Sequence, residues 1–162
     1  WVVVARSGGQ WLTLGRRARA GLTEASGAVV GARCVDRTAT GTEDGAIESV
    51  GRVEVVEAAK GTPPTVIQVR QPGGEFEGTG MVVPGAPLSE AGDEAVLFLE
   101  RAPDGDLRIV GMALGYLPVM ATSPGPSVVR VAPYLGEGFE SGGLRPVTDV
   151  LGRVRRLAER PR

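Results

Sequence analysis

Histidine is absent from the sequence, and cysteine occurs once, at Cys34. The first absence excludes Ser-His-Asp and Cys-His catalytic systems, and also His-ligated zinc, copper or haem, within this chain. The second excludes an internal disulfide and a metal site built from several cysteines. We therefore expect neither a cofactor nor a tightly bound transition metal.

Lysine is almost absent too, because Lys60 is the only one and arginine carries the remaining basic charge. The 18 basic and 19 acidic residues give a net charge of -1. A dedicated nucleic-acid-binding protein normally has a clear basic excess. Aromatic residues make up 4% of the chain, too few for a surface on which bases stack. Nucleic acid is therefore not expected as a partner.

Long apolar runs are also missing, so no stretch predicts a membrane-spanning helix. The chain begins at Trp1 and carries no basic-then-apolar signal segment. Removal of an export signal would explain both features, and so would a shortened sequence. We expect a periplasmic or secreted protein, with peripheral membrane contact left open.

The residues that are present suffice for one folded domain. Of the 162 residues, 42% are hydrophobic and 23% are charged, which fits a single domain with an ordinary core. We divide this domain (1–162) into three parts. These are an N-terminal strand and helix (1–27), a β-barrel (28–133), and a glycine-rich loop with a C-terminal helix (134–162).

The first part begins with the apolar run Trp1–Ala5, which predicts a strand. Thr13 is placed to cap a helix that ends at Ser26-Gly27. One apolar face of that helix is predicted by the spacing of Leu14, Ala18, Leu22 and Ala25.

The middle part has the pattern of β-strands. Ala28–Asp36 is rich in β-branched residues, and residues 47–55 alternate apolar and charged side chains, as a half-buried antiparallel strand does. Gly51 within the second run predicts a bulge or a bend. Asp44-Gly45 and Asp104-Gly105 predict hairpins. Further strands are expected at Thr65–Gln71, Gly80–Val83, Ala95–Glu100, Leu107–Tyr116 and Ser127–Val131.

These elements predict a mostly β fold, a small antiparallel OB-like barrel with one N-terminal and one C-terminal helix. A β-sandwich is the alternative. Ala95–Glu100 is apolar at both alternating positions, so this strand should be covered on both faces. The C-terminal helix begins near Pro146 and docks through Val147, Val150, Leu151, Val154 and Leu157.

Four motifs lie within residues 28–120. They are Glu54-Val55-Val56-Glu57 with Lys60-Gly61, Gln71-Pro72-Gly73-Gly74, Ala95-Val96-Leu97-Phe98-Leu99 and Val110-Gly111-Met112-Ala113-Leu114-Gly115. In these motifs the chain resembles an exported bacterial protein family of undefined function that is built on a small β-barrel. That barrel is similar to the OB-like fold of netrin-type modules and tissue inhibitors of metalloproteinases. The resemblance implies the fold and an exported origin. Those animal inhibitors act through an N-terminal cysteine and disulfides, whereas this chain has only Cys34.

Several features could carry chemistry, and each has a simpler interpretation. The carboxylates lie mostly in predicted turns, where solvated charge is favoured over the facing pair of a glycosidase. The acidic residues beside Gly45 and Gly105 are better explained as residues that form tight turns than as calcium ligands. Gly136-Glu137-Gly138 lacks the spacing of either nucleotide-binding motif. Cys34 shares a strand face with Val30 and Ala32, which predicts an inert buried thiol.

The strongest candidate for partner binding lies in the last part of the chain. Glycines surround Tyr134, Leu135 and Phe139, so these apolar side chains are expected to be poorly covered and to anchor a protein interface. The alternative is that Phe139 folds back onto the barrel.

A second candidate is the arginine cluster of the C-terminal helix, Arg153, Arg155 and Arg156, which could contact an acidic partner or anionic lipid. The simpler interpretation is that these arginines form a solvated helix face.

The sequence therefore favours a non-catalytic exported accessory or binding module that acts through protein–protein contact, including as a subunit of a larger assembly. One alternative is a protease-inhibitor-like regulator. The other is a hydrolase that uses carboxylates alone. We expect the partner to be another protein and assign no catalytic residue.

Overall fold

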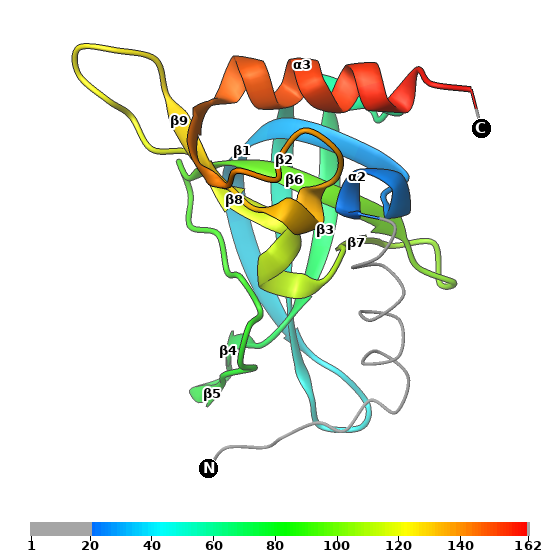
Figure 1. The fold of residues 1–162 in the computed structure, drawn as a ribbon. Coiled ribbons are helices and arrows are strands. Elements are labelled where there is room, and N and C mark those ends of the chain that lie inside the picture. The colour runs from blue at the N-terminus through cyan, green and yellow to red at the C-terminus, as the bar shows by residue number, and fades with distance from the viewer. Residues whose placement is uncertain (1–20, 162) are drawn as a thin grey trace.

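The computed structural model describes residues 21–161, and its fold is mostly β (Figure 1). The predicted strand Trp1–Ala5 and the start of the predicted first helix lie outside the described residues. Within them, that helix is represented by α2 (Leu22–Ala25). No helix in the described range is long and apolar enough to cross a membrane.

Five strands close a barrel in the order β1-β2-β3-β7-β6, and β6 returns to pair with β1. This closure confirms the predicted OB-like barrel. The barrel strands are β1 (Ala28–Gly41), β2 (Ile47–Lys60), β3 (Val66–Pro72), β6 (Glu94–Arg101) and β7 (Leu107–Ile109). The predicted hairpins at Asp44-Gly45 and Asp104-Gly105 join β1 to β2 and β6 to β7.

The seams of this barrel differ in length. Strands β1 and β6 pair antiparallel through six residue pairs. Strands β3 and β7 pair parallel through only two, Val69 with Leu107 and Arg70 with Arg108. The predicted irregularity is displaced from Gly51, which pairs regularly with Arg37. The register between β1 and β2 instead shifts at three other places, which skip Ala59 and Val56 in β2 and Val35 in β1.

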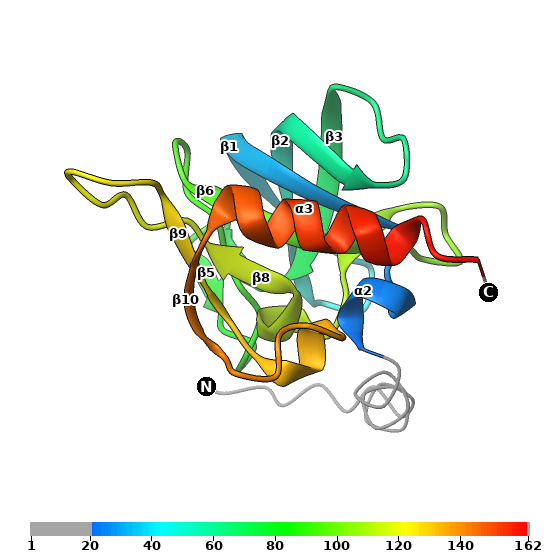
Figure 2. The ribbon, with the colours of Figure 1, turned by 45° about the horizontal axis from the view of Figure 1, so that its top comes forward.

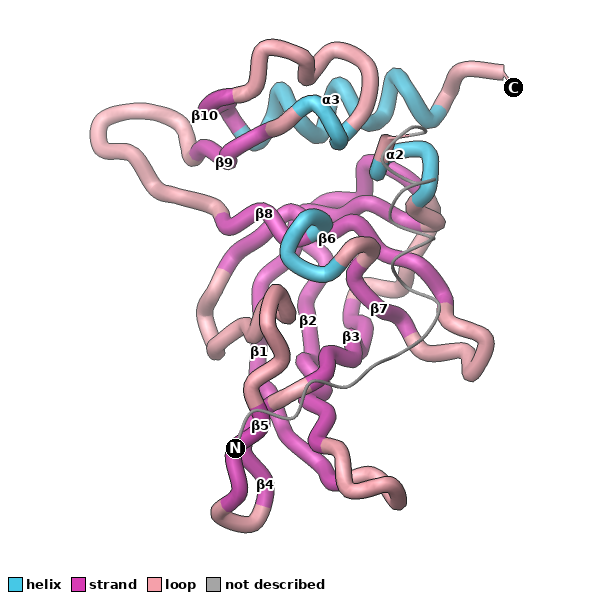
Figure 3. The backbone as a smooth tube through the Cα atoms, turned by 60° about the horizontal axis from the view of Figure 1, so that its bottom comes forward, coloured by secondary structure: helices cyan, strands magenta, loops and turns pink. Residues whose placement is uncertain are grey.

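Smaller elements extend from the barrel (Figures 1 and 3). Strand β8 (Tyr116–Pro118) follows the 3-10 turn η1 (Met112–Gly115) and pairs with the first half of β6, along the same edge as β7. The hairpin of β4 (Gly74–Phe76) and β5 (Thr79–Met81) lies at the end of the barrel away from α3 (Val147–Ala158). Strands β9 (Val128–Val131) and β10 (Gly143–Pro146) pair with each other, and between them the chain passes through the 3-10 turn η2 (Pro133–Leu135).

Two apolar cores explain why β1 and β6 are buried on both faces. Inside the barrel, Val30 of β1 and Leu97 of β6 meet residues of β2, β3 and β7. Outside it, Val29 and Phe98 meet α2, α3 and the segment after β9. Figure 2 shows α3 crossing in front of β1 and β2. The helix docks as predicted through Val150, Leu151 and Val154, which are buried, with Val147 and Leu157 packed at the margin.

Candidate functional site

The glycine-rich segment after β9 is part of the outer core. Leu135 and Phe139 are fully buried, and Tyr134 is half-buried against the same cluster. The expectation that Leu135 and Phe139 are poorly covered is therefore wrong. The turns around them explain this, because backbone hydrogen bonds from Phe139 N to Gly136 O and from Gly142 N to Phe139 O coil the segment back onto the barrel. The alternative in which Phe139 folds back is the observed one.

The arginines of α3 mainly fasten the helix to its neighbours. Arg153 Nε donates to the carbonyl oxygen of Glu137 at 2.8 Å, and Arg155 Nη2 donates to the Glu57 carboxylate of β2 at 2.6 Å. Gly138, with φ +91°, allows this approach, because a Cβ there would lie 2.2 Å from Arg153 Nε. Arg156 is exposed on the outer side of the helix. The three arginines therefore do not form one surface for an acidic partner, and a partner-binding role for them stays a prediction.

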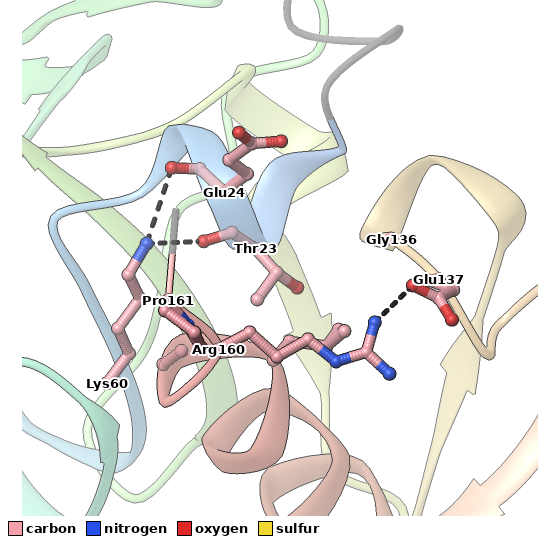
Figure 4. Close-up of a pocket in the computed structure, with 9 residues that line it drawn as sticks. Thr23, Glu24, Lys60, Gly136, Glu137, Arg160 and Pro161 are labelled. Atoms are coloured by element: carbon pink, nitrogen blue, oxygen red, sulfur yellow. Dashed lines mark hydrogen bonds and ion pairs between the residues drawn. The ribbon is translucent and has the colours of Figure 1, made fainter.

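A cavity of about 300 Å³ lies where α2, the glycine-rich segment and the end of α3 meet (Figure 4). Lys60 Nζ donates to the carbonyl oxygens of Thr23 at 2.7 Å and Glu24 at 3.3 Å. Arg160 Nη1 lies 2.5 Å from the Glu137 carboxylate, and Thr23 Oγ1 donates to Leu135 O at 2.5 Å. The polar groups around this cavity thus largely bind one another and hold the three segments together.

Two carboxylates, Glu24 and Glu137, border this cavity, and a carboxylate hydrolase at this site would need them to act as a pair. Both residues are exposed, and Glu137 is paired with Arg160. A carboxyl group that acts as a general acid near neutral pH needs an apolar enclosure, which neither residue has. The arrangement favours a structural joint over a catalytic pair.

Cys34 lies in the barrel wall as its pattern predicted, and 4% of it is exposed. Burial raises the pKa of its thiol, and the nearby carboxylates of Asp93 and Asp36 raise the pKa further. A high thiol pKa keeps the nucleophilic thiolate scarce. Cys34 is thus poorly suited to nucleophilic chemistry.

A different surface combines exposed apolar side chains with one arginine, and we call it the ribbon face. Beyond β8, Met120 and Val128 exchange two backbone hydrogen bonds of 2.8 Å, and this isolated bridge adds Met120 to the edge of the β9–β10 pair. Cross-strand partners point to the same side of a sheet, as do residues two apart in one strand. By this rule one side of the ribbon carries Met120, Val128, Arg130, Leu144 and Pro146.

The two sides of the ribbon differ sharply in burial. Val129 and Val131 of β9 point into the outer core and are almost inaccessible. On the ribbon face, by contrast, Met120 is 40% exposed and Leu144 is 55% exposed. Arg130 lies between these apolar groups, and within residues 21–161 no carboxylate forms an ion pair with it. The exposed loop 121–127 extends away from the body beside this face (Figures 1 and 2).

Sequence reasoning missed the ribbon face because its two exposed apolar residues, Met120 and Leu144, are 24 positions apart. One half of the ribbon, β9, was predicted as the strand Ser127–Val131. The other half lies in Gly143–Pro146, where one glycine directly after Gly142, together with a proline, indicates a loop. Only the pairing with β9 makes this segment a strand.

Comparisons of the chain with protein-family models, with curated proteins and with solved structures find no match. The functional proposal therefore depends on the residues and surfaces of this chain.

Proposed function

We propose that the protein is a non-catalytic, exported binding module that contacts another protein through the ribbon face. The observation that carries this proposal is the exposure of Met120 and Leu144 on one face of a hydrogen-bonded ribbon. Single exposed apolar residues are common on protein surfaces, whereas a contiguous apolar patch marks an interaction site.

The ribbon face also defines what the partner should offer. Met is an adaptable side chain at binding surfaces, and Leu144 adds a branched apolar group beside it. Arg130 is the charged residue of the face, and arginine is enriched at protein interfaces. The complementary surface is therefore apolar and bears a carboxylate that can pair with Arg130.

The proposal differs from the alternatives in where the contact lies. A protease-inhibitor-like regulator would insert a segment into an enzyme cleft, and a carboxylate hydrolase would work from the cavity near Glu137. Binding through the ribbon face requires neither, and it leaves the joint between α2 and α3 intact.

Cross-linking from defined positions tests the proposal. A photoreactive amino acid is placed at Leu144, on the ribbon face, or at Val56, which is 67% exposed on the barrel wall. The folded protein is then irradiated in extract from its native source. We expect a discrete cross-linked species from position 144 and not from position 56.

A charge reversal then identifies the contribution of Arg130. Arg130→Glu should weaken capture of the same species at least tenfold, while Glu43→Arg in the exposed turn between β1 and β2 leaves capture unchanged. Both variants should melt like the parent, because both side chains are exposed. Equal cross-linking from positions 144 and 56, or unchanged capture by Arg130→Glu, would contradict binding through this face.

A further inference from the structure

A second, much smaller cavity lies inside the barrel at the end away from α3. Its volume is about 20 Å³. Its walls are the inner residues of β2, β3, β6 and β7, and the loop residues Leu88 and Ser89 border it as well. That loop is fixed in place, because Ser89 Oγ donates to Tyr116 Oη at 3.3 Å and Gly92 N donates to Cys34 O at 2.8 Å.

Two hydrogen-bond donors at this cavity are buried without a partner. Gln71 is 8% exposed, and its Nε2 has no acceptor within the described part of the chain. The same holds for Nη1 of Arg37, although the Nη2 of that guanidinium donates to Glu90 Oε1 at 3.0 Å. Both residues border the cavity. Buried donors are almost always paired, so two unpaired donors at one cavity call for a shared acceptor.

The cavity has the size and chemistry for one acceptor atom. A cavity of 10–15 Å³ or more is roughly what a single water molecule requires. Ser49 is 1% exposed, and its hydroxyl donates to Gly73 O at 2.7 Å, so its oxygen lone pairs can accept from a water guest, whereas a halide has no proton to donate to them. Most of the other lining residues are apolar, among them Val53, Val69, Leu97 and Ile109.

We propose that this cavity is a binding site for one hydrogen-bond acceptor of atomic size, a water molecule or a halide ion, held between Arg37 Nη1 and Gln71 Nε2. The guest accepts from both donors. It thereby links β1 to β3 across the interior, a pair of strands that are not neighbours in the barrel.

A high-resolution crystal structure of the protein grown in sodium bromide tests the site directly. An anomalous bromide peak between the two nitrogens identifies a halide site, and an ordered non-anomalous peak identifies a water site. Either result supports the proposal. A cavity without density, or a Gln71 side chain whose Oε1 accepts from Arg37, overturns it.

Thermal unfolding of two matched variants gives an independent answer in solution. Gln71→Leu removes one donor and fills the space of the guest. The other donor, Arg37 Nη1, then remains buried without an acceptor. If the guest is present, Tm should fall by several degrees. Without a guest the same change removes an unpaired buried donor and Tm should rise. Gln68→Leu, on the exposed side of the same strand, should change Tm little.

Chloride dependence separates the two guests. At constant ionic strength, chloride replaces gluconate as the anion. For a halide site, the Tm of the parent rises with chloride concentration and the Tm of Gln71→Leu does not. For a water site, neither Tm depends on chloride. A rise in the Tm of Gln71→Leu above the parent in both salts overturns the proposal whichever guest is assumed.

Discussion

Phe139 is fully buried although Gly136, Gly138 and Gly142 surround it. Its ring fills the outer core together with Leu135 and Val154. Phe139→Ala should therefore reduce the free energy of unfolding by about 3–5 kcal/mol, measured by urea denaturation. Tyr134→Ala, which removes a half-buried ring nearby, should cost less. A urea midpoint for Phe139→Ala equal to that of the parent would place the ring outside the core.

Cys34 makes stability depend on pH at the alkaline end. Burial raises the pKa of the folded thiol above its ordinary value, so the unfolded chain loses this proton first as the pH rises. The contribution of Cys34 to the free energy of unfolding is fully present below the ordinary thiol pKa, about 8.5, and declines as the pH rises above that value. We expect the stability difference between the parent and Cys34→Ala to shrink from pH 7 to pH 10, as measured by urea denaturation. Burial also hinders labelling, so a thiol reagent that modified native Cys34 rapidly at pH 7 would contradict this account.

At the scale of elements, a set of charges spans the short parallel seam between β3 and β7. Glu48 of β2 contacts Arg70 of β3 at 3.4 Å and Arg108 of β7 at 3.3 Å. The turn before β7 completes the set, because Arg70 also pairs with Asp106 at 2.5 Å and Arg108 with Asp104 at 3.1 Å. These ion pairs reinforce a seam that has only two residue pairs.

Glu48→Gln should weaken that seam, because one carboxylate bonds to both arginines. The free energy of unfolding should fall by about 1 kcal/mol at low salt, which is a large effect for a partly exposed ion pair. The loss should be smaller in 0.5 M salt, because the charges are then screened. Urea denaturation at the two salt concentrations measures this. Glu54→Gln, on the exposed side of the same strand, is the control. An equal loss for both variants would show that the seam has no special dependence on Glu48.

Helix α3 depends on a close contact with β1. A Cβ at Gly31 would lie 3.3 Å from Leu151 Cδ1, so the missing side chain at Gly31 makes room for that leucine. Leu151→Ala should reduce the free energy of unfolding by about 2–5 kcal/mol, because the rigid barrel wall cannot collapse into the space. Calorimetric or urea unfolding measures the loss. The exposed Arg156→Ala serves as the control, and equal stability of the Leu151 variant and the parent would mean that the helix is not docked.

At the scale of the whole molecule, the two cores share their walls. Strands β1 and β6 contribute one face to each core, so neither core is complete without the other. A chain that ends at Pro146 should expose Val29, Val96 and Phe98, bind a hydrophobic dye such as ANS, and lose its cooperative thermal transition. A truncated chain that melts cooperatively without binding the dye would show instead that the barrel is self-sufficient.

The sequence predicts elements whose signals are local, and it misses contacts that pairing creates. Alternation identified residues 47–55 as a strand, two-sided apolarity identified β6, and helical spacing identified α3. Each of these patterns lies within one segment, because the core that the segment packs against determines which of its positions are apolar. Strand β10 and the burial of Phe139 depend on distant partners, so the local glycines point toward an exposed loop. The ribbon face and the small cavity beside Arg37 and Gln71 also arise only when distant strands pair.

The short β3–β7 seam has a consequence for the behaviour of the protein in concentrated solution. A closed barrel has no free strand edges, but opening at its weakest seam turns the ring into a sheet with edges at β3 and β7. Unpaired edges of this kind recruit strands from other chains. Because salt weakens the ion pairs across the seam, the conditions that promote edge-to-edge aggregation should be high ionic strength and moderate warming, well below global melting.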